Sequence, residues 1–265
     1  MKDKSAPLLQ FNNVSVIRGS YKRILDSISV TIHEGENVAI LGPNGAGKSS
    51  FIKTITREYY PIPAGKQFSF KIFGKENWDV FDLRNRLGIV TNFLQHIHTR
   101  DISGMDIVLS GFFSSIGLWH HVVTGTMQRR ANEIIDSLGI AHLRERKMTE
   151  MSSGEGRRFL IARALVHKPR ALILDEPTNS LDLHALHIFR KTLRKIARSG
   201  TTIILVTQDL QDITPEIGRV ILMKRGRFVF DGPKEKALTS ARMSSLFEVP
   251  VEVMIRDGYY YVFGY

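Results

Sequence analysis

The sequence of 265 residues contains no cysteine. Disulfide bonds, thiolate metal sites and thiol catalysis are therefore excluded, and the composition fits a reducing compartment. The sequence also lacks any run of about 18 apolar residues, the length that a transmembrane helix requires. Its polar start, MKDKSAPL, has no apolar centre of the kind found in secretory signal peptides. We therefore expect a cytoplasmic protein.

A continuous basic block is also missing, although the formal net charge is +11. A charge of this size can serve contacts with nucleic acid or with an anionic membrane. The basic residues are scattered, apart from two arginine doublets and a looser set over 190–198, and they do not alternate with aromatic residues. We interpret most of them as a solvated surface. Contacts with membrane headgroups, a membrane partner or nucleic acid remain the alternative.

The most informative stretch that is present is glycine-rich and reads GPNGAGKS. It fits the phosphate-binding pattern GxxxxGK[ST] at every fixed position, and it lies between a strand-like run at 37–41 and helix-like spacing at 50–55. Glycines let the main chain wrap phosphate oxygens, Lys48 adds positive charge at the start of the helix, and Ser49 can ligate Mg²⁺. The predicted nucleotide-binding residues here are Gly42, Pro43, Asn44, Gly45, Ala46, Gly47, Lys48, Ser49 and Ser50.

The order of predicted elements favours an α/β fold, a P-loop NTPase core with a parallel sheet. Strands at 8–17, 24–32 and 67–73 predict an N-terminal antiparallel β layer, and a helical signal over 92–151 predicts an inserted helical subdomain. Helix and strand alternate from 155 to 206, which implies parallel strands with crossover helices. The other predicted elements are strands at 87–91, 171–174 and 202–206, helices at 105–113, 127–138, 155–167 and 183–198, and hairpins at 220–231 and 249–263.

We expect one domain over residues 1–265, because the chain is long enough for a single large α/β core but not for two independent folds. Its predicted parts are a core over about 1–91 and 152–232, a helical subdomain over about 92–151, and a C-terminal extension with a hairpin over about 233–265.

Two adjacent carboxylates, Asp175 and Glu176, end an apolar strand-like run. Doubly wound sheets present ligands at the carboxyl ends of their strands. Asp175 would hold Mg²⁺ there, directly or through water, and Glu176 would polarise a water that attacks the γ-phosphate. After a phosphate loop, this pair favours a catalytic site over a strand capped by solvated acids.

With these two motifs, two further stretches resemble the ATPase subunits of ATP-binding cassette (ABC) proteins. The stretch MSSGE at 151–155, followed by GRRFLIARAL, is similar to the family signature LSGGQ and its helix, and NSLD at 179–182 is similar to the loop after the second carboxylate-bearing strand. The motifs fall in the family's order over residues 8–231. The resemblance implies an ATPase that uses ATP and Mg²⁺ and pairs head to tail, so that Ser152 and the Gly154 main chain contact the γ-phosphate held by the other chain.

The sequence departs from the family pattern where a histidine normally follows the late strand, because Gln208 stands there. A glutamine amide can donate a hydrogen bond to phosphate, but it cannot become cationic as charge develops. We therefore predict a catalytic role for Gln208 beside Glu176 and Lys48, with slow hydrolysis and with ATP binding and dimer closure retained. The alternative is that another group fills the role.

Three other departures leave positions open. The glutamine that enters the helical lobe in the family aligns with Asn92, and Gln95 lies three residues later, so either amide could approach Mg²⁺ and water. Arg18 stands near the usual adenine-stacking aromatic, where its guanidinium could stack, and Tyr21 is nearby. Glu155 replaces the last glutamine of the signature, and its charge opposes a nearby triphosphate unless the side chain points away.

The resemblance implies an ATP-hydrolysing transporter subunit on the cytoplasmic face of a membrane. Its partners would be a second copy or a related ATPase subunit and an integral membrane permease, and the chain resembles ATPases of the molybdate and metal-chelate importer groups. The apolar stretch FFSSIGLW at 112–119 is either a docking groove for the permease or core of the helical lobe. The alternative function is a non-transport ABC ATPase that acts as an ATP-gated regulator or nucleic-acid clamp, although such proteins usually carry two cassettes or coiled-coil insertions.

Overall fold

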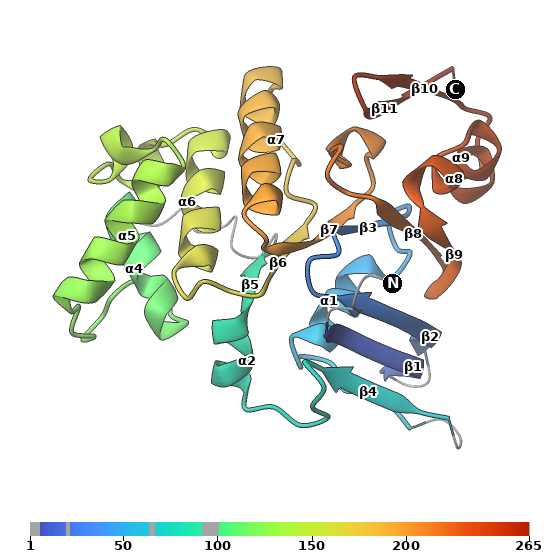
Figure 1. Ribbon diagram of the computed structural model, residues 1–265, viewed down its shortest axis with the longest axis horizontal. Coiled ribbons are helices and arrows are strands. Elements are labelled where there is room, and N and C mark those ends of the chain that lie inside the picture. Colours follow the sequence, from blue (N-terminus) through green and yellow to red (C-terminus); the bar gives the residue numbers. More distant parts are fainter. Residues whose placement is uncertain (1–5, 20–21, 64–66, 92–100, 265) are drawn as a thin grey trace. The chain divides into compact units, whose positions relative to one another are not determined.

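The computed structural model describes residues 6–19, 22–63, 67–91 and 101–264 (Figure 1). The chain forms two compact units, Met1–Val80 with Gly200–Tyr265, and Phe81–Ser199. The helical subdomain predicted over 92–151 falls within the second unit. Across the described residues, no helix combines the length and the apolar character needed to cross a bilayer.

The first unit contains an antiparallel sheet with β1 (Pro7–Arg18) between β2 (Lys22–His33) and β4 (Ser69–Ile72). Phe11 of β1 pairs with Val30 and with Phe70, and its ring centroid lies 4.4 Å from that of Phe70. The antiparallel β layer that the alternating pattern predicted is confirmed. Only β4 is shorter than predicted, because Gln67 lies in a turn.

The same unit contains a second sheet in which β3 (Val38–Leu41) lies between β7 (Thr202–Thr207) and β8 (Arg219–Lys224), parallel to both. A further strand, β9 (Arg227–Pro233), pairs antiparallel with β8. All residues of β3 and β7 are buried, as expected for parallel strands covered on both faces. The strand before the phosphate loop is therefore flanked on both sides, and α1 (Lys48–Ile55) follows the loop.

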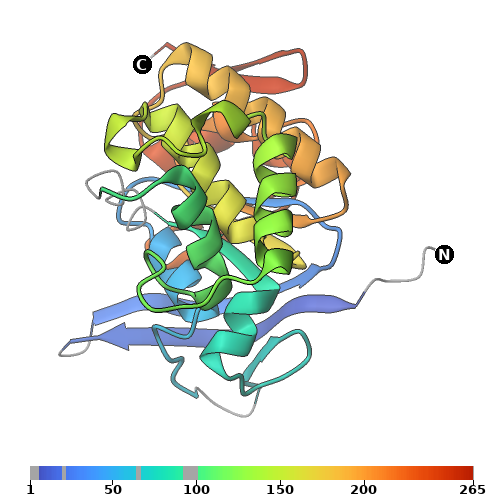
Figure 2. The ribbon, with the colours of Figure 1, turned by 90° about the vertical axis from the view of Figure 1, so that its left-hand side faces the viewer.

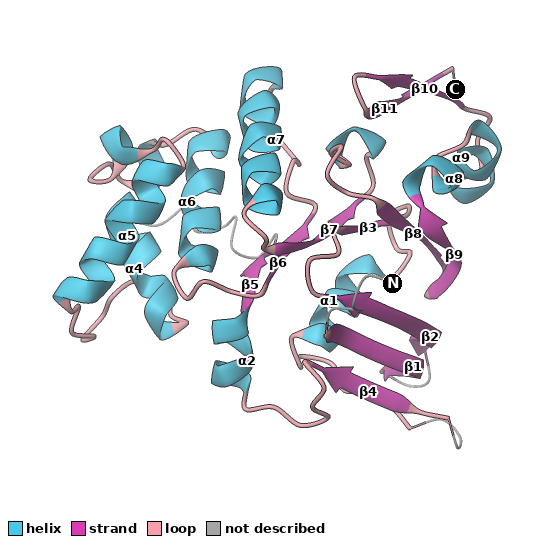
Figure 3. Ribbon diagram, viewed as in Figure 1, coloured by secondary structure: helices cyan, strands magenta, loops and turns pink. Residues whose placement is uncertain are grey.

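The C-terminal part of the first unit continues with α8 (Lys234–Ala237) and α9 (Ser240–Phe247), which the sequence did not predict (Figure 3). The predicted hairpin follows as β10 (Glu252–Arg256) and β11 (Tyr259–Phe263). Strand β11 packs against η5 (Leu210–Asp212), the short 3-10 turn beyond β7. The C-terminal extension thus contacts the segment that follows Gln208.

The second unit contains the parallel pair β5 (Leu87–Val90) and β6 (Ala171–Asp175), together with the helices α4 (Gly104–Ser110), α5 (Gly125–Ser137), α6 (Ser153–Leu165) and α7 (Leu183–Arg198). Helices α4, α5 and α6 pack against one another (Figures 1 and 2). The predicted helix at 105–113 ends in a 3-10 turn, η2 (Gly111–Phe113), and two more such turns follow, η3 (Ala141–Leu143) and η4 (Met148–Glu150). Helix α2 (Val80–Arg86) was not predicted, because one buried residue, Leu83, gives it no apolar period.

Candidate nucleotide-binding site

The phosphate loop joins β3 to α1 and is closed by its own lysine. The Lys48 Nζ donates hydrogen bonds to the carbonyl oxygens of Gly42 at 2.8 Å and Pro43 at 3.0 Å. Only 4% of Lys48 is exposed. The amine is therefore bonded to the first two residues of the loop and holds the loop in a wrapped form.

Glycine is required at two positions of this loop for different reasons. A Cβ on Gly42 would lie 2.2 Å from the main-chain carbonyl oxygen of Met223 in β8. Gly47 has a φ of +105°, and a Cβ there would lie 3.0 Å from the Ile24 carbonyl oxygen. The loop is thus packed against β8 and β2 too tightly for any other residue.

The start of α1 has the character of an anion site. Its N-cap residue is Gly47, so no side chain caps the first turn, and no acidic residue lies there. The N–H groups of such a turn carry partial positive charge and direct it toward an anion. Ser49 is exposed on this turn and Ser50 is half-buried. These features fit the predicted binding of a nucleoside triphosphate, for which the Ser49 hydroxyl would be an oxygen ligand of the accompanying Mg²⁺.

Gln208 follows the last residue of β7, Thr207, which is also bonded to the phosphate loop. The Gly42 N–H donates to the Thr207 carbonyl oxygen at 3.3 Å. Gln208 is half-buried. The structure therefore brings the predicted switch position and the phosphate loop to the same edge of one sheet.

Arg18 lies exposed at the end of β1, and its guanidinium carbon is 5.6 Å from the centroid of the Tyr59 ring. The Lys53 Nζ lies 5.4 Å from the same centroid. Tyr59 was not singled out in the sequence, where only the aromatic residue close to Arg18 in the chain, Tyr21, drew attention. Tyr21 lies outside the described residues.

The second unit holds the carboxylates, at the end of β6. Asp175 is the last residue of the strand and is 5% exposed. Glu176 has a φ of +45°, a backbone conformation that a glutamate adopts only at a cost. The Asn179 Nδ2 donates to the Glu176 Oε2 at 2.8 Å and so orients the carboxylate. Sequence reasoning noticed the loop that contains Asn179 but not this role.

The predicted signature forms the start of α6. Ser152 is the N-cap: its Oγ accepts from the Glu155 N–H at 3.3 Å, and the Glu155 carboxylate accepts from the Ser152 N–H at 2.8 Å. Burial acts to raise the pKa of Glu155, but the hydrogen bonds from Ser152 and the positive charges of Arg146 and Arg158 together outweigh it, and the pKa is lowered. The glutamate is thus folded back on Ser152 as a capping box.

Gly154 has a packing role that the sequence did not predict. A Cβ at this position would lie 2.6 Å from the Cβ of Ala185 in the first turn of α7. The absence of a side chain lets α6 and α7 approach closely at the end where Ser152 lies. The helix α7 is itself capped by Asp182, which accepts from the Ala185 N–H at 2.7 Å.

The predicted residues are thus distributed over two units. The first contains the phosphate loop with Gln208 and Arg18, and the second contains Asp175, Glu176, Ser152 and Gly154. Asn92 and Gln95, the two candidate amides near Mg²⁺, lie outside the described residues. Within the described part of the chain, no group of three or more histidine, cysteine and acidic side chains is placed to hold a metal ion.

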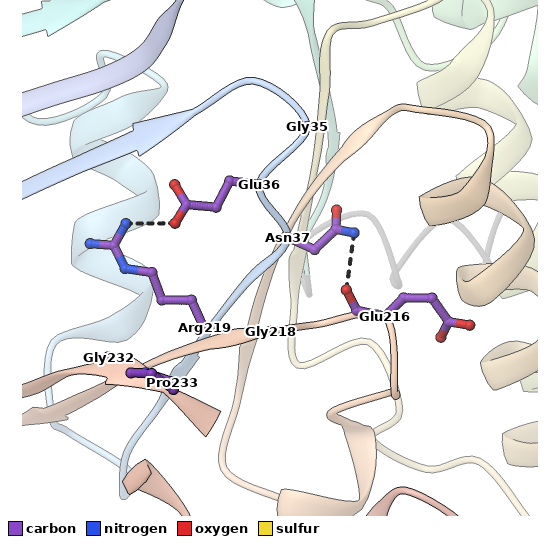
Figure 4. Close-up of a pocket in the computed structure, with 8 residues that line it drawn as sticks. All are labelled: Gly35, Glu36, Asn37, Glu216, Gly218, Arg219, Gly232 and Pro233. Atoms are coloured by element: carbon purple, nitrogen blue, oxygen red, sulfur yellow. Dashed lines mark hydrogen bonds and ion pairs between the residues drawn. The ribbon is translucent and has the colours of Figure 1, made fainter. Parts of the chain in front are cut away.

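A cavity of about 480 Å³ opens elsewhere in the first unit, at the start of β3 and β8 (Figure 4). Its polar lining is paired: the Arg219 guanidinium lies 2.9 Å from the Glu36 carboxylate, and the Asn37 amide donates to the Glu216 carbonyl oxygen at 3.2 Å. Because the phosphate loop follows the other end of β3, this cavity lies at the opposite edge of the sheet from the nucleotide site.

Comparison with known proteins connects this geometry to a family. The protein family described as ABC transporter matches residues 25–179. The chain is 33% identical over 249 residues to the uncharacterized ABC transporter ATP-binding protein YlmA of Bacillus subtilis, covering 93% of each chain. It is 30% identical to the hemin import ATP-binding protein HmuV of Bradyrhizobium diazoefficiens, covering 92% of this chain and 90% of that protein.

Solved structures show the same fold. A metal-chelate type ABC transporter in an inward-facing conformation matches with a TM-score of 0.78 and 23% identity, over 97% of this chain and 96% of that one. The cbiO1 protein of Clostridium perfringens, part of the ABC transporter complex cbiONQ, matches with a TM-score of 0.75 and 25% identity, over 91% and 94%. The predicted α/β P-loop fold is confirmed.

Proposed function

Because this chain belongs to the ABC transporter ATP-binding family, we propose that it hydrolyses ATP as one half of a head-to-tail dimer and drives a separate membrane permease. The observation that carries the proposal is the phosphate loop. Its buried Lys48 is bonded to Gly42 and Pro43, and the first turn of α1 is open to an anion. A lysine beside main-chain N–H groups is suited to the β- and γ-phosphates of ATP.

The carboxylates at the end of β6 supply the second half of the chemistry. Asp175 and the Ser49 hydroxyl offer hard oxygen ligands of the kind that Mg²⁺ prefers. Bound Mg²⁺ would neutralise charge on the phosphate oxygens. Glu176 accepts a proton from the attacking water, and its hydrogen bond to Asn179 holds the carboxylate in one orientation before substrate arrives.

A second chain completes the site in this proposal. Ser152 and Gly154 stand at the N-terminus of α6, where main-chain N–H groups favour a γ-phosphate presented by a partner. A chain of similar fold is known as a dimer with ADP and phosphate bound, with a TM-score of 0.68. A related ATPase subunit could take the place of the second copy.

The permease contact is proposed at the apolar segment that follows α4. Trp119 is 75% exposed and Val122 is 82% exposed, which is unusual for large apolar side chains. Arg163 of α6 anchors this segment through its bond to the Ser115 carbonyl oxygen at 2.9 Å, and burial lowers the pKa of Arg163 to about 10. A permease that presses on this segment would act on the same helix that Ser152 caps.

The cargo is recognised by the permease in this arrangement. Because relatives of this chain are named for hemin import, hemin is the first metal chelate to test. The test measures whether hemin stimulates the ATPase activity of the assembled transporter. The relatives named as transporter proteins do not favour the alternative of a non-transport regulator or nucleic-acid clamp.

The test uses the Glu176→Gln variant of the full chain. With ATP and Mg²⁺ it should form a stable dimer on size-exclusion chromatography with light scattering, while its turnover falls at least about 100-fold below wild type. Lys48→Ala is the matched control, because it should bind no ATP and remain monomeric. A Glu176→Gln protein that stays monomeric at saturating ATP, or that hydrolyses ATP as fast as wild type, would overturn the proposal.

A further inference from the structure

The buried carboxylate of Asp212 lies four residues after Gln208 and is hydrogen-bonded to Thr207, the residue immediately before Gln208. The Thr207 hydroxyl donates to the Asp212 Oδ2 at 2.5 Å, and both residues are 1% exposed. Burying a carboxylate is unfavourable unless hydrogen bonds compensate, so the bond from Thr207 helps to stabilise Asp212 in its buried position. It lies entirely within the first unit.

The same hydroxyl also fixes the residue after Gln208. Because its proton goes to Asp212, the Thr207 Oγ1 can accept from the Asp209 N–H, at 3.0 Å. The Asp209 carboxylate in turn accepts from the Gln211 N–H at 2.9 Å and caps η5. One hydroxyl thus ties together the residues on both sides of Gln208.

The main chain before Gln208 is tied to the phosphate loop as well. Thr207 pairs with Leu41 in the sheet, and its carbonyl oxygen accepts from the Gly42 N–H at 3.3 Å. Beyond η5, β11 packs over the turn, and Leu210 and Ile213 are buried. The backbone of Gln208 is therefore held from both directions, which leaves its side chain as the part that can respond to nucleotide.

We propose that Asp212 is a positioning residue for ATP hydrolysis, which holds Gln208 toward the phosphate loop through the Thr207 hydroxyl. The inference rests on the proposed function. Asp212 touches no nucleotide itself; its carboxylate orders the turn, and the ordered turn fixes where the Gln208 amide can donate. A preorganised donor stabilises developing charge without reorganising during the reaction, and that benefit is lost when the donor is mobile.

The test compares steady-state turnover with ATP affinity in matched variants. Thr207→Val removes the hydroxyl at nearly constant volume, and Asp212→Leu removes the oxygen that accepts from it. Each should lower kcat about 10-fold while KM for ATP changes less than about twofold. Thr207→Ser, which keeps the hydroxyl, should retain most of kcat. Thr214→Val is the control, because Thr214 is a fully buried threonine of the same segment.

A double variant separates positioning from general loosening of the fold. In a Gln208→Ala background, Thr207→Val should produce no further loss of kcat, because it acts through Gln208. The inference is overturned if Thr207→Val lowers kcat by the same factor in the Gln208→Ala background as in wild type. It is also overturned if Thr214→Val lowers kcat as much as Thr207→Val does. A third contrary result is an active wild type whose kcat the Thr207→Val and Asp212→Leu variants equal. Absence of wild-type turnover would instead overturn the proposed function together with the inference. Thermal unfolding midpoints identify any variant that fails to fold, and if Asp212→Leu fails, the Thr207 variants carry the test.

Discussion

The hydroxyl of Ser152 donates a hydrogen bond of 2.9 Å to the carboxylate of Glu155. The residue expected to reach across to a γ-phosphate is therefore bonded to an anion of its own chain. In the proposed dimer the hydroxyl has to exchange this partner for ATP, and the carboxylate stays close to the triphosphate. The Ser152 and Glu155 side chains therefore stabilise the start of α6 as a capping box, and in the proposed dimer the same two side chains would oppose ATP-dependent closure.

Glu155→Gln should therefore strengthen ATP-dependent dimerisation. A glutamine can keep the cap, because its amide oxygen still accepts from the Ser152 N–H, but it removes the repulsion. We expect dimer affinity at saturating ATP to improve by about 1 kcal/mol, roughly fivefold, measured by sedimentation in the Glu176→Gln background. Glu150→Gln, at a nearby exposed glutamate, is the control and should change little. Weaker dimerisation of Glu155→Gln would contradict the prediction.

The capping box also predicts a pH dependence of stability. The pKa of Glu155 is lowered below its usual value of 4.5, so its contribution is present above that value and is lost as pH falls through the lower pKa of the folded state. Wild type and Glu155→Gln should therefore differ in free energy of unfolding near pH 6, and the difference should shrink as the pH falls below 4.5. Urea unfolding at several pH values measures it. A difference that stays constant across this range would mean that the ionised carboxylate is not the stabilising form.

Two of the three glycines in the phosphate loop, Gly42 and Gly45, should differ in how much stability an alanine substitution costs. Gly42→Ala places a Cβ against the Met223 carbonyl oxygen, whereas Gly45 has a φ of +77° with open space around its Cβ position. We expect Gly42→Ala to lower the free energy of unfolding by about 3 kcal/mol and to weaken ATP binding. Gly45→Ala should cost about 1 kcal/mol, for the backbone alone. Chemical denaturation and nucleotide titration report the two effects, and equal losses would refute the packing argument.

Elements with a strong period or a strict motif could be predicted from the sequence. Helix α7 was predicted with its observed ends, Leu183 and Arg198, because Asp182 supplies a cap and apolar residues recur on one face. The phosphate loop was predicted from glycines and a lysine at fixed spacing, together with the strand-like run before it and the helix-like spacing after it. Helices α2 and α8 were missed, because segments of seven and four residues are too short to display a helical period.

Side-chain hydrogen bonds between residues that are close in sequence were harder to predict. The Thr207 hydroxyl could equally have bonded its own main chain, and only the fold of η5 places Asp212 against it. Glu155 was recognised as a charge near the nucleotide, but its direction depends on where α6 begins. A helix start one residue later would have left the capping box unformed. Helix ends are the least certain part of a sequence prediction. SSGE was recognised as a plausible helix cap, but the helix was predicted to start at Glu155 and not at Ser153, so the direction of the Glu155 side chain was not fixed in advance.

Gln208→His tests whether the glutamine limits the rate of hydrolysis. An imidazolium can carry positive charge as negative charge grows on the γ-phosphate, whereas an amide donates only a neutral hydrogen bond. We expect kcat to rise at least about 10-fold with little change in ATP affinity, because the Thr207 hydroxyl already orders the backbone at this position. Gln211→His places the same imidazole three residues away, on η5, and should leave kcat unchanged. If Gln208→His leaves turnover at the wild-type value, the amide is sufficient for the reaction or another group fills the role, and slow hydrolysis has to be sought elsewhere in the site. If Gln208→His and Gln211→His accelerate turnover equally, the acceleration comes from added positive charge near the phosphate loop and does not depend on position 208.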